Sequence, residues 1–230
     1  MTQNSRITVV TGAAGALGQA VVRLLTAQGH RVACLDRDEA RLQSLFGESG
    51  QLLAACDVTS DQSMADTLTV LTRGGEHINV LVHVAGGFEM GEAAHALTRE
   101  SWDRMMNLNA WAFVAVTRAV IPNMLRHGGG KVIAVSAAAA AKGAAQKAAY
   151  IASKSALQRL VESLSAEVRA QGISVNSVAP TTMDTPANRQ SMPDADRSAW
   201  VTLDSAAQTI AALATPAGDV VHGQHVQLGA

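Results

Sequence analysis

The sequence has few aromatic residues: one tyrosine, three phenylalanines and three tryptophans make up 3% of its 230 residues, while hydrophobic residues make up 48%. With so few rings and many alanines and glycines, a core has to be filled by small and aliphatic side chains. This composition indicates helices packed closely on a sheet. The length suits one large domain with a full hydrophobic core, so we expect a single domain over residues 1–230.

An excess of charge of either sign is also missing. Eighteen Lys and Arg stand against 19 Asp and Glu, for a formal net charge of −1, and no basic run stands out. A nucleic-acid or anionic-membrane partner is therefore not expected. No apolar run approaches the roughly 18 residues of a membrane span, and residues 1–5 lack a signal-peptide core. The sequence predicts a cytoplasmic protein that acts on a small molecule.

Cysteine is limited to Cys34 and Cys56, each of which closes an apolar run. We interpret them as buried thiols in a reducing compartment, with a disulfide or redox pair as the alternative. The seven histidines lack a ligand spacing. Even His222 and His225, three residues apart, have no acidic residue nearby, so no metal site is expected.

Short apolar runs alternate with helical patterns along the chain. Such runs predict a parallel sheet covered by helices on both faces. Two of the intervening helices are long, at about 100–126 and 148–170. The span 181–200 contains two prolines and predicts a substrate or lid loop with a short helical turn. The expected strands are 7–10, 31–35, 52–56, 78–84, 131–135, 173–178 and 226–228.

Glycines are concentrated between the first strand and the first helix, in Thr-Gly-Ala-Ala-Gly-Ala-Leu-Gly at 11–18. Glycine permits a tight turn there, lets the backbone approach a pyrophosphate, and directs the helix N-terminus at it. A plain tight turn is the alternative, but the strand before and the helix after favour a dinucleotide site. The predicted coenzyme residues of this turn are Gly12, Ala14, Gly15, Ala16, Leu17 and Gly18.

Asp36 closes the second strand about 18 residues after this turn, where a carboxylate can hold the ribose hydroxyls of adenosine. Because it would repel a 2′-phosphate, the sequence favours NAD(H) over NADP(H). Arg37 weakens this preference and leaves NADP(H) possible, although a solvated charge also explains it. Asp57 and Val58 after the third strand could bracket the adenine, with a helix N-cap as the alternative role of Asp57.

Tyr150 and Lys154 stand at positions i and i+4 of a predicted helix and so point the same way. A neighbouring cation stabilises the phenolate, and should bring the tyrosine pKa from about 10 toward neutral. We therefore predict a general acid/base pair.

Several motifs follow one another along the chain: the glycine turn, Asp36, Asp57, Ala85-Gly86, Asn109, the Tyr150/Lys154 pair and the segment 180–185. Together they resemble the short-chain dehydrogenase/reductase family over essentially the whole chain. The resemblance implies a Rossmann-type doubly wound α/β sheet of about seven parallel strands with helices on both faces. It also implies homodimers or homotetramers joined through the two long helices.

The same resemblance implies the roles of individual residues. Tyr150 transfers the proton, Lys154 holds the nicotinamide ribose and lowers the phenol pKa, and Asn109 orders a water beside the lysine. Thr185 orients the nicotinamide amide, and Thr185-Pro186 also reads as an N-cap followed by proline at the first helical position. The other coenzyme residues implied in this way are Val84, Ala85, Gly86, Pro180, Thr182 and Met183.

Three positions depart from the family pattern. Ala137 stands where the family has its catalytic serine, Val84 replaces an asparagine, and Ala16 replaces the middle glycine. Ser136 adjoins Ala137, but neighbours on a strand face opposite ways. Losing one donor to a substrate carbonyl costs roughly 3–4 kcal/mol of barrier, so a simple ketone would react slowly.

The dihydropteridine reductase branch of the family shares these departures. It resembles this chain in Gly-Ala-Leu-Gly at 15–18, in Val-Ala-Gly-Gly at 84–87, in alanine at the serine position and in the run Asp-Thr-Pro-Ala-Asn-Arg-Gln-Ser-Met-Pro at 184–193. Asn109 departs from this branch. The resemblance implies a quinonoid dihydropterin-like substrate, already polarised, that takes hydride with Tyr150 as proton donor.

Two alternatives stay open. One is a 3-ketoacyl or alcohol-type carbonyl reductase that has lost catalytic power with Ala137, and the other is a non-catalytic dinucleotide-binding subunit or sensor. Retention of Tyr150, Lys154 and Asn109 argues against the second. The candidate substrate contacts are Gly87, Phe88, Met192 and Trp200.

Overall fold

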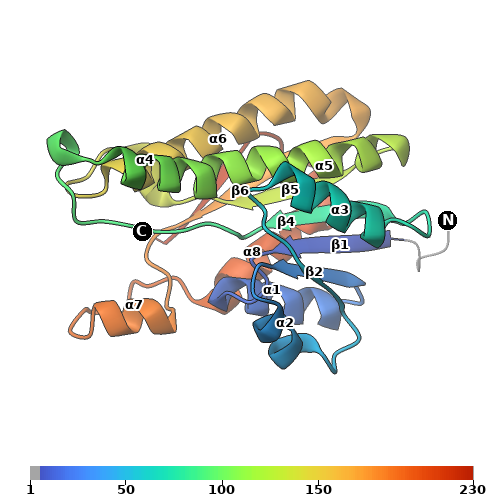
Figure 1. Cartoon of the computed structure of the whole chain (residues 1–230), viewed down its shortest axis with the longest axis horizontal. Helices are drawn as coiled ribbons and strands as arrows, with labels where there is room; N and C mark the ends of the chain where they lie inside the picture. The colour runs from blue at the N-terminus through green and yellow to red at the C-terminus, as the bar shows by residue number, and fades with distance from the viewer. Residues whose placement is uncertain (1–5, 230) are drawn as a thin grey trace.

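The structure is a computed structural model that describes residues 6–229, within which seven strands form one sheet in the order β3-β2-β1-β4-β5-β6-β7 (Figure 1). Every adjacent pair is parallel, which confirms the predicted doubly wound fold. The strands are β1 Arg6–Thr11, β2 Val32–Asp36, β3 Leu52–Ala55, β4 His77–His83, β5 Gly130–Val135, β6 Ile173–Pro180 and β7 His225–Leu228. The α-helices are α1 Ala16–Ala27, α2 Glu39–Phe46, α3 Asp61–Leu71, α4 Arg99–Met106, α5 Ala112–Arg126, α6 Ala148–Val168, α7 Pro186–Ser191 and α8 Leu203–Ala214.

The sheet carries a hydrophobic core on each face. Along β4, Val80 and Val82 pack toward α1, α2 and α8, while Leu81 between them packs toward α3, α5 and α6. Successive strand side chains point to opposite faces, so a strand buried on both faces must be apolar throughout. Figure 1 shows these two helical layers above and below the sheet. The small side chains of α8 bring it close to α1, as the aromatic-poor composition predicts.

The first long helix is interrupted. The run predicted at 100–126 consists of α4, a π-helical turn η3 Asn107–Trp111, and α5. One extra residue per turn rotates the helix register locally, and such turns are frequent at functional sites. Asn109 lies in this turn and is 1% exposed. Helical propensity alone gives no signal for this interruption.

The same run also corrects the expectation about apolar length. Residues Arg99–Arg126 form 28 helical residues with an 18-residue window of mean hydropathy 1.2, enough by length and composition to cross a membrane. More than half of that window, 56%, is buried inside the fold. A buried fraction of this size is typical of a core helix that packs on a sheet.

The strand order reverses between β1 and β4, and a crevice at the carboxyl ends of such strands is the usual ligand site of a doubly wound sheet. Two long segments border it, the loop that follows β4 and the span after β6. Within the latter, α7 stands apart from the sheet below α4 (Figure 1). Its N-cap is as predicted: the Thr185 hydroxyl accepts from the Asn188 N–H, and Pro186 occupies the first turn.

Candidate active site

A cavity of about 750 Å³ opens at the carboxyl ends of the central strands. Its described lining contains no Asp or Glu, and its only cationic residues are Lys147 and Lys154. Twelve of the residues predicted from the sequence line it. They are Leu17, Val84, Gly86, Gly87, Phe88, Tyr150, Lys154, Pro180, Thr182, Met183, Thr185 and Met192.

Tyr150 lies in the first turn of α6 with its ring against Phe88, the two centroids 4.8 Å apart at 80°. Burial raises the pKa of Tyr150 to about 12, because the phenolate is poorly solvated there. This direction is opposite to the expected lowering by Lys154, since desolvation dominates. The phenol is consequently protonated throughout the neutral range, which is the form that donates a proton.

Lys154 follows one turn later on the same helix and is 5% exposed. Its ammonium donates to the Val135 carbonyl oxygen at 2.9 Å, at the end of β5. Burial lowers the pKa of Lys154 to about 8 by penalising its charged form. The loop after β4 passes so near that a Cβ on Gly86 would lie 3.1 Å from Nζ, which explains glycine at that position.

Asn109 joins three elements through its side-chain amide. Oδ1 accepts from the Gly87 N–H at 2.9 Å, and Nδ2 donates to the Gly87 carbonyl and to Ser153 Oγ, both at 3.0 Å. Ser153 in turn donates to the Tyr150 carbonyl at 2.7 Å. The π-turn thus fastens the loop after β4 to the helical turn that carries Tyr150. A role of Asn109 in ordering water stays a prediction, and no pattern in the sequence indicates Ser153.

No accessible hydroxyl replaces the missing serine at the end of β5. Ala137 and Ser136 both line the cavity. The Ser136 hydroxyl oxygen, however, is shielded from solvent and has no hydrogen-bond partner among the described residues. A substrate in this cavity therefore meets the Tyr150 phenol without a serine donor beside it.

The glycine turn fits a dinucleotide. Gly12 has φ +65°, and a Cβ on it would lie 2.8 Å from the Ala85 nitrogen; on Gly18 a Cβ would lie 2.1 Å from the Gly12 carbonyl oxygen. Gly15 is exposed at the N-cap of α1, and no described side chain caps that helix end. The free N–H groups and the positive dipole end at the N-terminus of α1 are suited to binding a pyrophosphate.

Asp36 reaches the same turn from β2. Its Oδ2 accepts from the Ala14 N–H at 3.0 Å, which places a half-buried carboxylate beside the predicted adenosine side of the turn. Arg37 is exposed. The turn and the carboxylate, far apart in sequence, are therefore one local structure.

Three predicted contact residues are outside the lining of this cavity. Asp57 accepts from both the N–H and the hydroxyl of Thr59, and Ser60 rather than Asp57 caps α3, so the N-cap alternative is wrong. Val58 is buried in the core against α3. Trp200 is outside the cavity lining, with the Arg197 guanidinium 5.7 Å from its ring centre, so the prediction that it faces the substrate is not supported.

The two cysteines are free and buried, as predicted. Burial raises the pKa of Cys34 to about 12, which leaves it an unreactive thiol. Within residues 6–229, no group of three or more His, Cys, Asp or Glu could hold a metal ion.

Known proteins with similar sequences and structures place these features in context. The sequence profile of the short chain dehydrogenase family matches residues 6–196. The chain is 32% identical over 182 residues to dehydrogenase/reductase SDR family member 6 of Rattus norvegicus, covering 79% of this chain and 72% of that protein. It is 31% identical over 182 residues to carbonyl reductase family member 4 of Danio rerio, covering 76% and 75%. The solved structure of gox2181 has a TM-score of 0.91 at 26% identity, covering 97% of this chain and 94% of that one.

Proposed function

The chain belongs to the short-chain dehydrogenase/reductase family of nicotinamide-dependent oxidoreductases, and from this premise we propose that it is an NADH-preferring reductase of a planar, electron-poor substrate such as a quinonoid dihydropterin. The observation that carries this proposal is the absence of an accessible hydroxyl beside Tyr150, at Ala137 and Ser136. A ring that is already polarised needs no second donor, whereas a plain ketone does.

Each of these cavity residues has a separate role in the proposed reduction. A bound nicotinamide dinucleotide supplies the hydride. Tyr150, protonated at neutral pH by its raised pKa, supplies the proton at its hydroxyl oxygen. Lys154 would hold the nicotinamide ribose, and Asn109 keeps the Tyr150 turn and Gly87 in place. The ring of Phe88, edge-on to Tyr150, offers a flat apolar surface to a planar substrate.

NADH oxidation at its absorbance maximum tests the proposal directly. Quinonoid dihydropterin should be reduced, and Tyr150→Phe should lower kcat by about 10²- to 10⁴-fold, the usual contribution of a positioned acid. Tyr150→Phe should still bind NADH. Turnover that survives this substitution would contradict the proposed role of Tyr150, and no turnover of the pterin would contradict the proposed substrate.

Coenzyme preference is tested separately by Asp36→Ser. Asp36 would repel a 2′-phosphate beside the Ala14 N–H, so removing its charge should improve NADPH affinity relative to NADH by about 10-fold. Tighter NADPH than NADH binding in the unaltered protein would refute the NADH preference.

The second candidate is a carbonyl reductase with weakened catalysis. It is favoured by the similarity to carbonyl reductase family member 4 and by Asn109, which the dihydropteridine reductase branch lacks. In this case a short panel of ketones and a ketoacyl thioester should be turned over slowly, and Ala137→Ser should raise their kcat. NADH binding without turnover of any of these compounds would instead support a non-catalytic subunit.

We further propose a cytoplasmic homodimer or homotetramer joined through the long helices. Trp111 is 41% exposed and Leu125 42% exposed, both on the outer side of the α4–α5 run. Their burial would remove apolar surface from water. Light scattering should give a mass at least twice the 23.8 kDa of the chain, and Trp111→Glu should reduce it.

A further inference from the structure

One of the two cations in the cavity has no part in the proposed reduction. Lys154 is buried and committed to the Val135 carbonyl, whereas Lys147 lies near the mouth, three residues before Tyr150. In the described part of the chain, Lys147 forms no ion pair and no hydrogen bond through its side chain. Its ammonium lies 5.8 Å from the centre of the Phe88 ring.

The backbone holds Lys147 in this place. Gln146 has φ +59°, a left-handed conformation that is uncommon outside glycine. Its carbonyl accepts from the Gly91 N–H at 2.9 Å, which ties this residue to the loop after β4. Strained backbone of this kind persists only where its surroundings hold it, and it is frequent at ligand sites.

The acidic residues that line the hollow beside Lys147 have hydrogen-bond partners of their own. Lys147 also borders a smaller hollow of about 130 Å³ that Glu89 and Glu92 line. Glu89 is paired with Arg104 at 2.5 Å, and Glu92 accepts from the Thr98 hydroxyl at 3.2 Å. Lys147 is therefore a positive charge beside the main cavity that forms no ion pair with a carboxylate of the described chain, although Glu92 lines the adjoining hollow.

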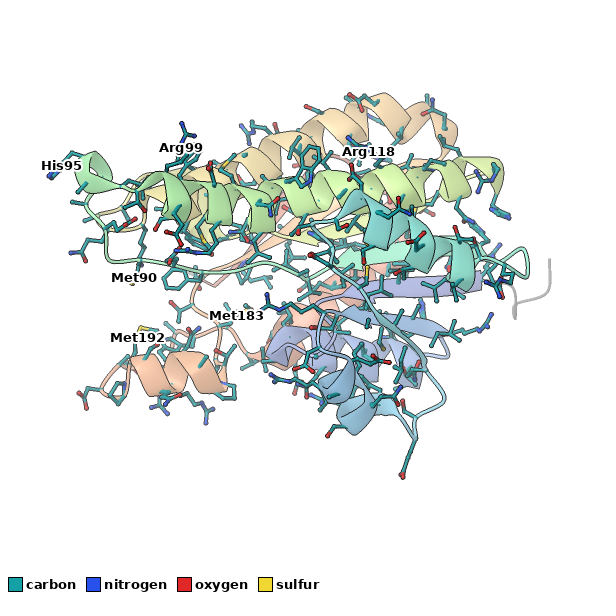
Figure 2. All side chains as sticks on the ribbon, viewed as in Figure 1. Met90, His95, Arg99, Arg118, Met183 and Met192 are labelled. Carbon is teal, nitrogen blue, oxygen red and sulfur yellow. The ribbon has the colours of Figure 1, made fainter. Side chains whose placement is uncertain are left out.

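The side chains around this charge are apolar. Phe88 is 57% exposed, Met90 51% and Met192 37%, although each is a large hydrophobic residue. Figure 2 shows Met90 on the loop below α4 and Met192 at the end of α7, and both residues line the cavity. Thioethers adapt to irregular shapes and contact rings favourably. The mouth thus offers an apolar surface with one positive charge at its edge.

We propose that Lys147 determines substrate specificity by binding an anionic group, so that the planar, electron-poor substrate of the reductase also carries an acidic group and its aromatic or apolar portion lies against Phe88. This inference rests on the proposed reductase function, because it concerns the substrate of the same site. A carboxylate bound to the Lys147 ammonium would form a charge-assisted hydrogen bond, with the aromatic or apolar portion of the same molecule against Phe88.

The test is a matched pair of ligands that differ only in charge. Calorimetry in saturating NADH should give 4-phenylbutanoate an affinity about 10- to 100-fold higher than 4-phenylbutanamide, the range that a hydrogen bond to a charged group contributes. In Lys147→Gln this ratio should fall to near one, and in Lys147→Arg it should be kept. Lys142→Gln, which removes an exposed lysine outside the cavity lining, should leave the ratio unchanged. A ratio near one in the unaltered protein, or a ratio untouched by Lys147→Gln, would overturn the proposal.

Turnover separates this inference from the proposed function. If NADH reduces 4-oxo-4-phenylbutanoate, slowly as expected for a ketone without a serine donor, but faster than its amide, and the difference disappears in Lys147→Gln, both the anion site and the reductase function stand. If neither ketone nor pterin is reduced but the binding ratio holds, the reductase function fails and the anion site stands. If the keto acid and its amide are reduced equally, the anion site fails while the reductase stands.

Discussion

The two ends of the cavity are built in different ways. At the coenzyme end the backbone itself forms the surface, because Gly12 and Gly18 beside the α1 N-terminus leave no room for a side chain. Asp36 is fixed there by a hydrogen bond that it accepts from the Ala14 N–H. The substrate end is made of exposed side chains on long connections, among them Phe88 and Met192. Substitutions at the first end should therefore damage the fold and coenzyme binding together, whereas those at the second should change specificity alone.

The largest effect is expected at the coenzyme end. In Gly18→Ala the new Cβ would lie 2.1 Å from the Gly12 carbonyl oxygen, a clash with backbone that no rotamer relieves. We expect the free energy of unfolding to fall by about 3 kcal/mol or more, and NADH affinity to fall with it. Urea denaturation and NADH titration measure both.

Gly143→Ala is the matched control outside the coenzyme turn, since its Cβ would meet no atom within 4 Å. Its unfolding free energy should change by less than about 0.5 kcal/mol. Equal effects of the two substitutions would show that the contrast between the two ends does not hold.

Asn109→Ala should have the next largest effect, because this residue fastens the loop after β4 to the turn of α6 that carries Tyr150. It would leave the Gly87 N–H and carbonyl without their partners, and we expect about 2 kcal/mol of lost stability. The turnover rate should fall by about 10-fold or more as the Tyr150 turn loosens. Asn107→Ala, exposed in the same π-turn, should change neither thermal denaturation nor turnover.

The same contrast explains what could be predicted from the sequence. The sheet and the glycine turn follow from local patterns, because strand periodicity and glycine sterics act over a few residues. The hydrogen bond between Asp36 and the turn joins residues 22 positions apart and depends on the fold. The π-turn and the Asn109–Gly87–Ser153 contacts depend on how two helices pack against a loop, which no local pattern encodes. The sequence also gave the wrong direction for the pKa of Tyr150, since burial is a property of the whole fold.

The spacing of Lys147 from Tyr150 could have indicated a cavity residue, but the sequence prediction did not include it. It precedes Tyr150 by three residues, so that the two stand about one helical turn apart. Lysines are usually solvated, however, and only its place on the cavity lining distinguishes Lys147 from Lys142.

The pH dependence of the reaction should be governed by Lys154. Burial lowers the pKa of Lys154 to about 8, so its charge is present below pH 8 and lost as the pH rises through that value. The phenol, with a pKa of about 12, keeps its proton over this range. The value of kcat/KM, which reports the free enzyme, should therefore decline above about pH 8, approaching 10-fold per pH unit. Lys154→Arg should lose this decline, since arginine stays charged; an unchanged profile would assign it to another group.

The smallest effect is expected from Phe88→Leu, and it tests whether the substrate end can change without the fold. Phe88 is 57% exposed, so its ring contributes little to the core, and thermal denaturation should shift by less than about 2 °C. The edge-on contact with Tyr150 at 4.8 Å is lost, and with it the flat surface offered to a planar substrate. Because one aromatic pair is worth about 0.5–1.5 kcal/mol, KM for an aromatic substrate should rise by about 2- to 10-fold. KM for an aliphatic ketone should stay the same, so equal increases for both substrates would mean that Phe88 positions Tyr150 rather than the substrate ring.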